Sequence, residues 1–165
     1  MKPLSRARSS AFFSLALGVI APVHAGTSNA VLEVTGGAHA GRHSISAANQ
    51  CLLADKPPAG KPRKFEVNIG SQAKDPKALT LVSVLLRRLD GPAPVAADQL
   101  IQIQFGPLGG KGVFYQAGFN STTGRTGTPA TVTFKDGGAK ASATFEFESD
   151  GVKLKGTIDC DLMRY

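Results

Sequence analysis

Residues 139–160, AKASATFEFESDGVKLKGTIDC, decide the fold class of this chain. Over their first ten positions, apolar side chains alternate with Lys, Ser, Thr or Glu, which is the period-two pattern of a half-buried strand. Residues 149–151 (Ser-Asp-Gly) interrupt the alternation as a turn. The pattern then resumes from Val152 to Cys160. The segment therefore predicts an antiparallel hairpin whose last strand points Cys160 inward.

Shorter alternating segments recur upstream of this hairpin. They predict strands at residues 30–35, 41–53, 65–69, 99–105, 112–117 and 131–134. Residues 54–64 carry three prolines and must form a loop, and the Gly- and Thr-rich residues 120–129 are expected to form a mobile surface loop. About eight short strands in a single domain at residues 26–165 favour an all-β, antiparallel β-sandwich over a closed barrel.

Residues 78–89 (ALTLVSVLLRRL) fit two periods. As a helix covering residues 76–89, they would carry an apolar stripe through Leu79, Val82 and Leu86. As a strand, they would be buried on both faces. Because strands surround this segment, we favour the strand and keep one packed helix as the alternative.

The N-terminus has the pattern of a secretory signal. Three basic residues precede an apolar run at residues 11–20, which is too short to span a bilayer, and small residues follow it. We therefore predict a signal peptide at residues 1–25 that is removed by cleavage after Ala25. The mature protein would lie in the periplasm or outside the cell, with no transmembrane segment.

Because the chain is predicted to be exported, its cysteines are expected to be oxidised. The chain has only two, Cys51 and Cys160. In an oxidising compartment a lone pair usually bonds, and no Cys-x-x-Cys spacing points to redox or metal chemistry. We predict a Cys51–Cys160 disulfide, which by closing a loop of roughly 100 residues contributes about 4–5 kcal/mol.

Two pairs of residues are candidates for catalysis or metal binding. His39 and His43 would share one face of a helix, but three glycines among residues 36–43 disfavour that helix. On an extended strand the two lie about 13 Å apart, so we expect surface or loop histidines without a metal. Glu146 and Glu148 share one strand face, where a glycosidase is possible. Cross-strand pairing with nearby lysines explains them better.

The glycine-rich residues 106–112 lack the Ser or Thr that follows the lysine of a phosphate loop. Lys111, Phe114 and Tyr115 remain candidates for a ligand-binding loop. The formal net charge is +7, of which the signal segment carries three units, so the mature chain keeps about +4. This charge is mild and spread along the chain, which argues against a nucleic-acid partner.

Several features resemble the mycobacterial 19 kDa lipoprotein antigen family. They are Cys51 after an alternating strand, the Gly/Thr-rich middle and the closing residues 154–160 (LKGTIDC). The resemblance covers most of residues 30–160 and implies a disulfide-closed, all-β domain. This chain has no cysteine directly after its apolar run, so the lipid anchor of that family is not expected here.

These observations favour an exported, non-enzymatic β-sandwich that binds a partner in the envelope or periplasm, such as an envelope protein or a glycan, or contributes to the envelope itself. No cofactor is expected. One alternative is a small secreted hydrolase that uses Glu146 and Glu148 or His39 and His43. Another is an adhesin or pilus-like subunit that assembles by strand exchange. The lining of the largest pocket would separate a carrier from a protein that recognises its partner through loops.

Overall fold

The C-terminal hairpin forms as its alternation predicts. The computed structural model describes residues 26–90 and 95–165 and places β10 (Lys140–Ser149) beside β11 (Val152–Arg164). Both residues of the intervening turn, Asp150 and Gly151, have positive φ angles, 52° and 74°. A two-residue turn of this kind matches the right-handed twist of paired strands. The hairpin is therefore closed by the local sequence itself.

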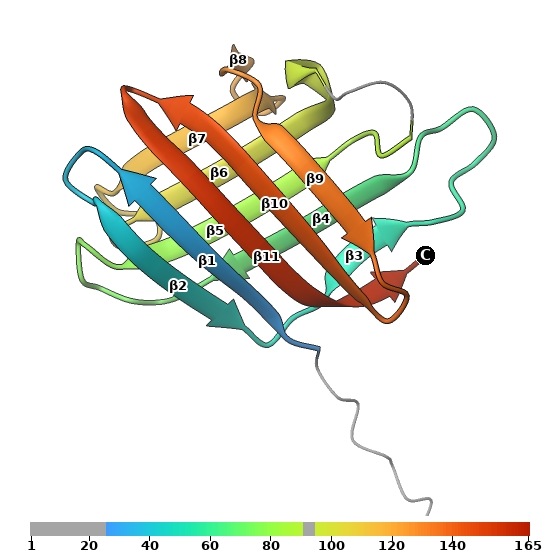
Figure 1. Cartoon of the computed structure of the whole chain (residues 1–165), viewed down its shortest axis with the longest axis horizontal. Helices are drawn as coiled ribbons and strands as arrows, with labels where there is room; N and C mark the ends of the chain where they lie inside the picture. Colours follow the sequence, from blue (N-terminus) through green and yellow to red (C-terminus); the bar gives the residue numbers. More distant parts are fainter. Residues whose placement is uncertain (1–25, 91–94) are drawn as a thin grey trace, which may run out of the picture.

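The hairpin lies in a first layer of five antiparallel strands, in the order β2, β1, β11, β10, β9 (Figure 1). The other three strands of this layer are β1 (Ser28–Thr35), β2 (Gly41–Ala47) and β9 (Thr131–Asp136). The inward positions of β10 and β11 are buried from Ala141 and Val152 onward. This layer thus presents one apolar face and one charged face.

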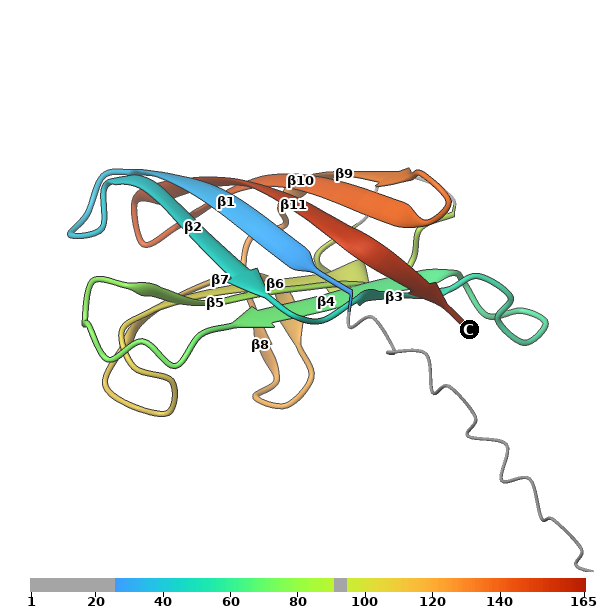
Figure 2. The same ribbon diagram turned by 90° about the horizontal axis from the view of Figure 1, so that it is seen from below.

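A second layer lies across the apolar face of the first (Figure 2). Its strands are antiparallel neighbours in chain order. They are β3 (Cys51–Ala54), β4 (Lys64–Gly70), β5 (Leu79–Leu86), β6 (Gln99–Phe105), β7 (Val113–Asn120) and the short β8 (Arg125–Thr126). One turn of 3₁₀ helix, Ala96–Asp98, precedes β6. The fold is an all-β sandwich.

Strand β11 joins the two layers. Its body belongs to the first layer, whereas its last residues, Leu162 to Arg164, pair in parallel with β3 of the second layer. A disulfide between Cys160 of β11 and Cys51 of β3 fixes this crossing, with a Cα–Cα distance of 5.9 Å. Both half-cystines are buried. The predicted disulfide is therefore present, at the point where the layers meet.

One continuous core fills the space between the layers. Strands of both layers contribute alternating apolar side chains to this core, as a period of two requires. The largest fully buried side chains are Phe65, Phe105, Leu32, Leu53, Ile69, Ile101, Ile103, Leu154 and Ile158. At one end of the core, Phe65 of β4 packs against Phe134 of β9, with ring centroids 4.7 Å apart.

The structure corrects several expectations about the strands. Residues 41–53 form two strands, β2 and β3, in different layers, because the chain leaves the first layer at residues 48–50. The strand favoured at residues 78–89 is confirmed as β5, Leu79–Leu86, which is flanked by β4 and β6, and the alternative helix at residues 76–89 is wrong. The described strands number eleven, where about eight were expected. The expected signal at residues 1–25 lies outside the described residues.

Candidate binding site

The two histidines lie closer together than an extended strand would place them. His39 sits in the turn before β2 and is 7% exposed, and its ring stacks on Phe105 at 4.3 Å between centroids. His43 meets the same phenyl ring edge-on at 4.7 Å, and its Nε2 hydrogen-bonds the His39 carbonyl oxygen. His39 thus lies in a loop, as expected, but its side chain is buried. Both rings serve to pack over Phe105, and the described residues contain no cluster of three or more metal-ligating side chains.

His43 also lines a cleft of about 430 Å³ between β2 and the β4–β5 loop, together with Ser44, Ser46 and Ser71. His43 and two of the three serines are already engaged within the chain. Ser46 donates to the side chain of Asn29, and the Ser71 hydroxyl accepts the Ala73 amide. The histidine has no described hydrogen bond to a serine. This cleft therefore lacks a base–nucleophile pair of the kind that serine hydrolysis requires.

Glu146 and Glu148 lie on the charged outer face of the first layer. The register places them directly opposite Lys155 and Lys153 of β11. Neither glutamate lines the cleft beside His43. The pair thus has the cross-strand neighbours expected of a solvated sheet face.

The three candidates for a ligand loop do not share a face. Tyr115 points into the core and is 4% exposed, whereas its neighbour Phe114 points outward and is 44% exposed. Lys111 lies in the preceding loop and is exposed. Because successive residues of a strand face opposite sides, Phe114 and Tyr115 cannot contact one small ligand together.

A different pocket combines apolar walls with charged side chains of a single sign. It has a volume of about 330 Å³ and is lined by residues of the β3–β4 loop and by Tyr165. This loop lies beside the end of β11 (Figures 1 and 2). We call it the proline–lysine pocket. Its lining residues are Ala54, Lys56, Pro57, Pro58, Lys61, Pro62, Lys64 and Tyr165. The lysines are its charged side chains, and the described residues give none of the three an ion-pair partner.

The loop that forms this pocket is stiff. Its tip is a β-turn at residues 58–61, in which the Lys61 amide donates to the Pro58 carbonyl at 3.0 Å. Gly60 occupies the third position with a φ of 78°, a conformation that favours glycine in a type II turn. Prolines before and after the turn fix further φ angles. The backbone of the pocket walls therefore needs little ordering when a ligand binds.

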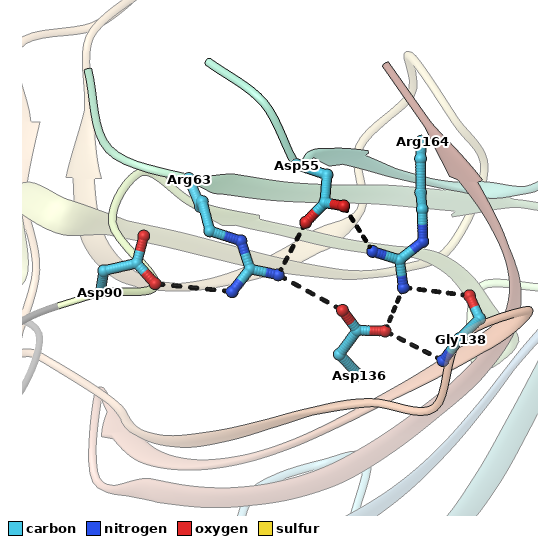
Figure 3. Close-up of polar contacts among 6 residues, drawn as sticks. All are labelled: Asp55, Arg63, Asp90, Asp136, Gly138 and Arg164. Atoms are coloured by element: carbon cyan, nitrogen blue, oxygen red, sulfur yellow. Dashed lines mark hydrogen bonds and ion pairs between the residues drawn. The ribbon is translucent and has the colours of Figure 1, made fainter. Parts of the chain in front are cut away.

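Side chains of the same loop form an ion-pair network on its other side (Figure 3). Asp55 bridges two guanidinium groups, at 3.1 Å to Arg63 and 2.9 Å to Arg164. Asp136 of β9 also pairs with both arginines, at 3.3 Å to Arg63. Asp90 adds a contact of 3.5 Å to Arg63. We call these five side chains the arginine–aspartate network.

The network is anchored to the backbone at the β9–β10 turn. The Gly138 amide donates to Asp136 Oδ1 at 3.0 Å, and Arg164 donates to the Gly138 carbonyl oxygen at 3.1 Å. This backbone bond and the bond from Arg164 hold the pKa of Asp136 below its usual value. The bond to Asp136 likewise raises the pKa of Arg164. The charged forms of both groups are therefore favoured in the folded chain.

The network positions the pocket because their residues alternate along the chain. Asp55 lies between Ala54 and Lys56, and Arg63 lies between Pro62 and Lys64. Arg164 precedes Tyr165, whose amide donates to the Leu53 carbonyl oxygen at 3.1 Å. Neighbouring residues of extended backbone face opposite sides. The three chain segments that line the pocket are thus each held from behind by an ion pair.

Sequence reasoning missed this site. It identified residues 54–64 as a loop but gave them no role, since prolines and lysines in a loop are common. The network joins residues up to 109 positions apart, Asp55 and Arg164 among them, and no local pattern links them. One available signal was the occurrence of three lysines and three prolines within nine residues, without any acid beyond Asp55.

Comparisons of the chain with protein-family models, with curated proteins and with solved structures find no match. The resemblance to the lipoprotein antigen family therefore stays a prediction. Within residues 26–90 and 95–165, no helix is long and apolar enough to cross a membrane.

Proposed function

We propose that this chain is an exported, non-enzymatic binding protein that holds its ligand in the proline–lysine pocket. The observation that carries the proposal is the arrangement of the β3–β4 loop. Its lysines and prolines face the pocket, while Asp55 and Arg63 on its other side tie it to β9 and β11. A preformed concave site with few charged groups is typical of ligand-binding proteins.

The proposed location is the periplasm or the extracellular space. The N-terminal pattern of basic residues, an apolar run and small residues supports export. The Cys51–Cys160 disulfide supports an oxidising compartment, because such bonds are rare where thiols are kept reduced.

The two alternatives draw less support from the geometry. A hydrolase would need its acids or histidines to meet in a pocket, but Glu146 and Glu148 lie on an outer face opposite lysines, and His39 packs on Phe105. Strand exchange would need a core strand with an open edge. Strands β1, β3, β4, β5, β6, β10 and β11 each pair on both sides within the described sheet.

The test incubates immobilised protein with envelope extract and identifies bound material by mass spectrometry. A variant with Lys56→Gln, Lys61→Gln and Lys64→Gln should lose the material that the wild type retains, because the pocket then lacks its charge. A matched control with Lys135→Gln, Lys153→Gln and Lys155→Gln removes the same charge from the first layer's outer face. This control variant should still retain the bound material.

Equal retention by all three proteins, or retention by none, would contradict the proposed function. Thermal unfolding of both variants checks that they fold. Exposed lysines that lie away from buried features usually change stability by less than about 0.5 kcal/mol when substituted, so both variants should fold like the wild type.

A further inference from the structure

The walls of the proline–lysine pocket indicate the chemistry of its ligand. Three proline rings, the Ala54 methyl group and the Tyr165 ring provide apolar contact, and Tyr165 is 67% exposed. The charged side chains of the lining are all lysines, and the main-chain oxygen of Tyr165 accepts the Asp55 amide at 3.2 Å. An ammonium group is a compact donor that pairs with a carboxylate, sulfate or phosphate without demanding one geometry. The pocket is therefore complementary to a negative head group.

The rest of the ligand is expected to be apolar. A sugar presents several hydroxyl groups, and each of these must keep a hydrogen-bond partner when it leaves water. The lining side chains offer three ammonium groups and one phenol, and none of them is an amide, a carboxylate or an aliphatic hydroxyl. A hydrocarbon or aromatic body leaves no polar group unpaired against the proline rings.

The surroundings of Lys56 are compatible with a negative head group. A second hollow of about 260 Å³ shares Lys56 and Tyr165 with the pocket and adds Asp55 and Arg164 to its lining. The carboxylate of Asp55 is directed at Arg63 and Arg164. It is therefore already neutralised and does not repel a negative head group placed beside Lys56.

We infer that the proline–lysine pocket binds a small amphiphilic anion, with an acidic head group at Lys56, Lys61 and Lys64. Its hydrocarbon or aromatic body packs against the proline rings and Tyr165. A volume near 330 Å³ is at the lower end of the range of ligand pockets, about 300–1,000 Å³, which suits a single-chain molecule. This inference rests on the proposed function and adds the ligand class.

Octanoate is the probe, with octanol as the neutral analogue and acetate as the bare head group. Binding is followed by tyrosine fluorescence, because the chain has two tyrosines and no tryptophan, and by calorimetry. Octanoate should bind at least tenfold more tightly than octanol, and acetate should not bind measurably. Because the lysines are exposed, sodium chloride at 0.5 M should weaken octanoate binding several-fold.

Variants of the protein distinguish the contacts made by the head group from those made by the hydrocarbon body. Lys56→Gln/Lys61→Gln/Lys64→Gln should weaken octanoate binding at least tenfold and leave octanol unchanged. The matched control Lys135→Gln/Lys153→Gln/Lys155→Gln should bind octanoate like the wild type. Tyr165→Phe should abolish most of the fluorescence change while calorimetry still detects binding, since the ring remains.

Equal binding of octanoate and octanol, or of octanoate by both triple variants, would overturn the inference. So would binding to phosphatidylglycerol vesicles without binding to octanoate, because it would point to a membrane surface instead. If octanoate fails while the extract experiment still depends on the three lysines, the ligand class is wrong and the proposed function stands. If both fail, the pocket is not a binding site.

Discussion

At the scale of single residues, Gly156 shows that the centre of the first layer has no space for a larger side chain at this position. It lies on β11 directly opposite Phe145 of β10, whose ring covers it. A Cβ atom at this position would overlap the ring of Phe145. We therefore expect Gly156→Ala to lower the free energy of unfolding by about 1–3 kcal/mol, the usual cost of overpacking a core.

Urea unfolding measures this loss. The double variant Gly156→Ala/Phe145→Leu is the control, because a smaller side chain at position 145 makes room for the new methyl group. It should cost less than the sum of the two single substitutions. Strictly additive costs would show that Phe145 is not what excludes a side chain at Gly156.

The lowered pKa of Asp136 leads us to expect that the stability of the chain depends on pH in the acid range. The Gly138 amide and the Arg164 guanidinium lower its pKa in the folded chain, so the unfolded chain binds the proton more readily. Its contribution to stability is therefore fully present above the unfolded value, near 3.9, and is lost as the pH falls through the lower folded value. Melting temperatures measured from pH 7 to pH 2 should fall steeply below about pH 4.

The variant Asp136→Asn tests whether this carboxylate is responsible. It should melt at a lower temperature than the wild type at pH 7, and the difference should narrow as the pH falls below 4. Asp159→Asn, at an outward-facing position of β11, is the matched control. If Asp159→Asn reduces the acid-dependent loss of melting temperature as much as Asp136→Asn does, that loss arises from the overall charge of the chain and not from the network.

At the scale of strands and loops, the disulfide holds together elements that pair only briefly. β3 has four residues, and its parallel ladder with β11 covers three of them. Replacing Cys51 and Cys160 by alanine should lower the free energy of unfolding by about 2–5 kcal/mol. A chemical-denaturation midpoint unchanged by this double substitution would show that the ladder and the core suffice without the bond.

The sequence predicts strands well where one face of a strand meets water. The alternation of β10 and β11 is complete because the outer face of the first layer is solvated. The ambiguity at residues 78–89 arose because β5 is flanked on both edges and all eight of its residues are buried or partly buried, so it has no exposed polar face to reveal its period. Only the neighbouring strands could decide it.

What the sequence could not show is where the chain changes layer. Residues 41–53 read as one strand because Ile45 and Cys51 both face inward, yet they do so in different layers. The arginine–aspartate network was hidden for a related reason. Its partners meet only after the layers stack, and each is an ordinary loop or terminal charge in the sequence. The pocket depends on that network, so it was hidden as well.

At the scale of the whole molecule, the site lies where the two layers are joined. β11 crosses from one layer to the other, the disulfide fixes the crossing, and the β3–β4 loop extends beside its end. The arginines of the network reach from this loop and from β11 to Asp136 at the edge of the first layer. The feature that closes the sandwich thus also shapes the pocket.

Export is the last property to be argued at this scale. The described structure begins at Gly26, which is buried against Gln50 and Asp161, and the Thr27 amide donates to Asp161 at 2.9 Å. Cleavage after Ala25 would leave these contacts in place. We expect the chain, expressed in a bacterial host with its N-terminus intact, to accumulate outside the cytoplasm as residues 26–165.

Intact mass spectrometry measures the cleavage, and alkylation of the unreduced protein should label neither cysteine. A variant with Ala25→Leu should be retained as the longer precursor, since the peptidase reads a small residue at that position. In contrast, Ala30→Val changes a small residue within β1 and should leave processing unchanged. Full-length protein with two free thiols in the cytoplasm would refute export, and with it the compartment in which we place the pocket and its ligand.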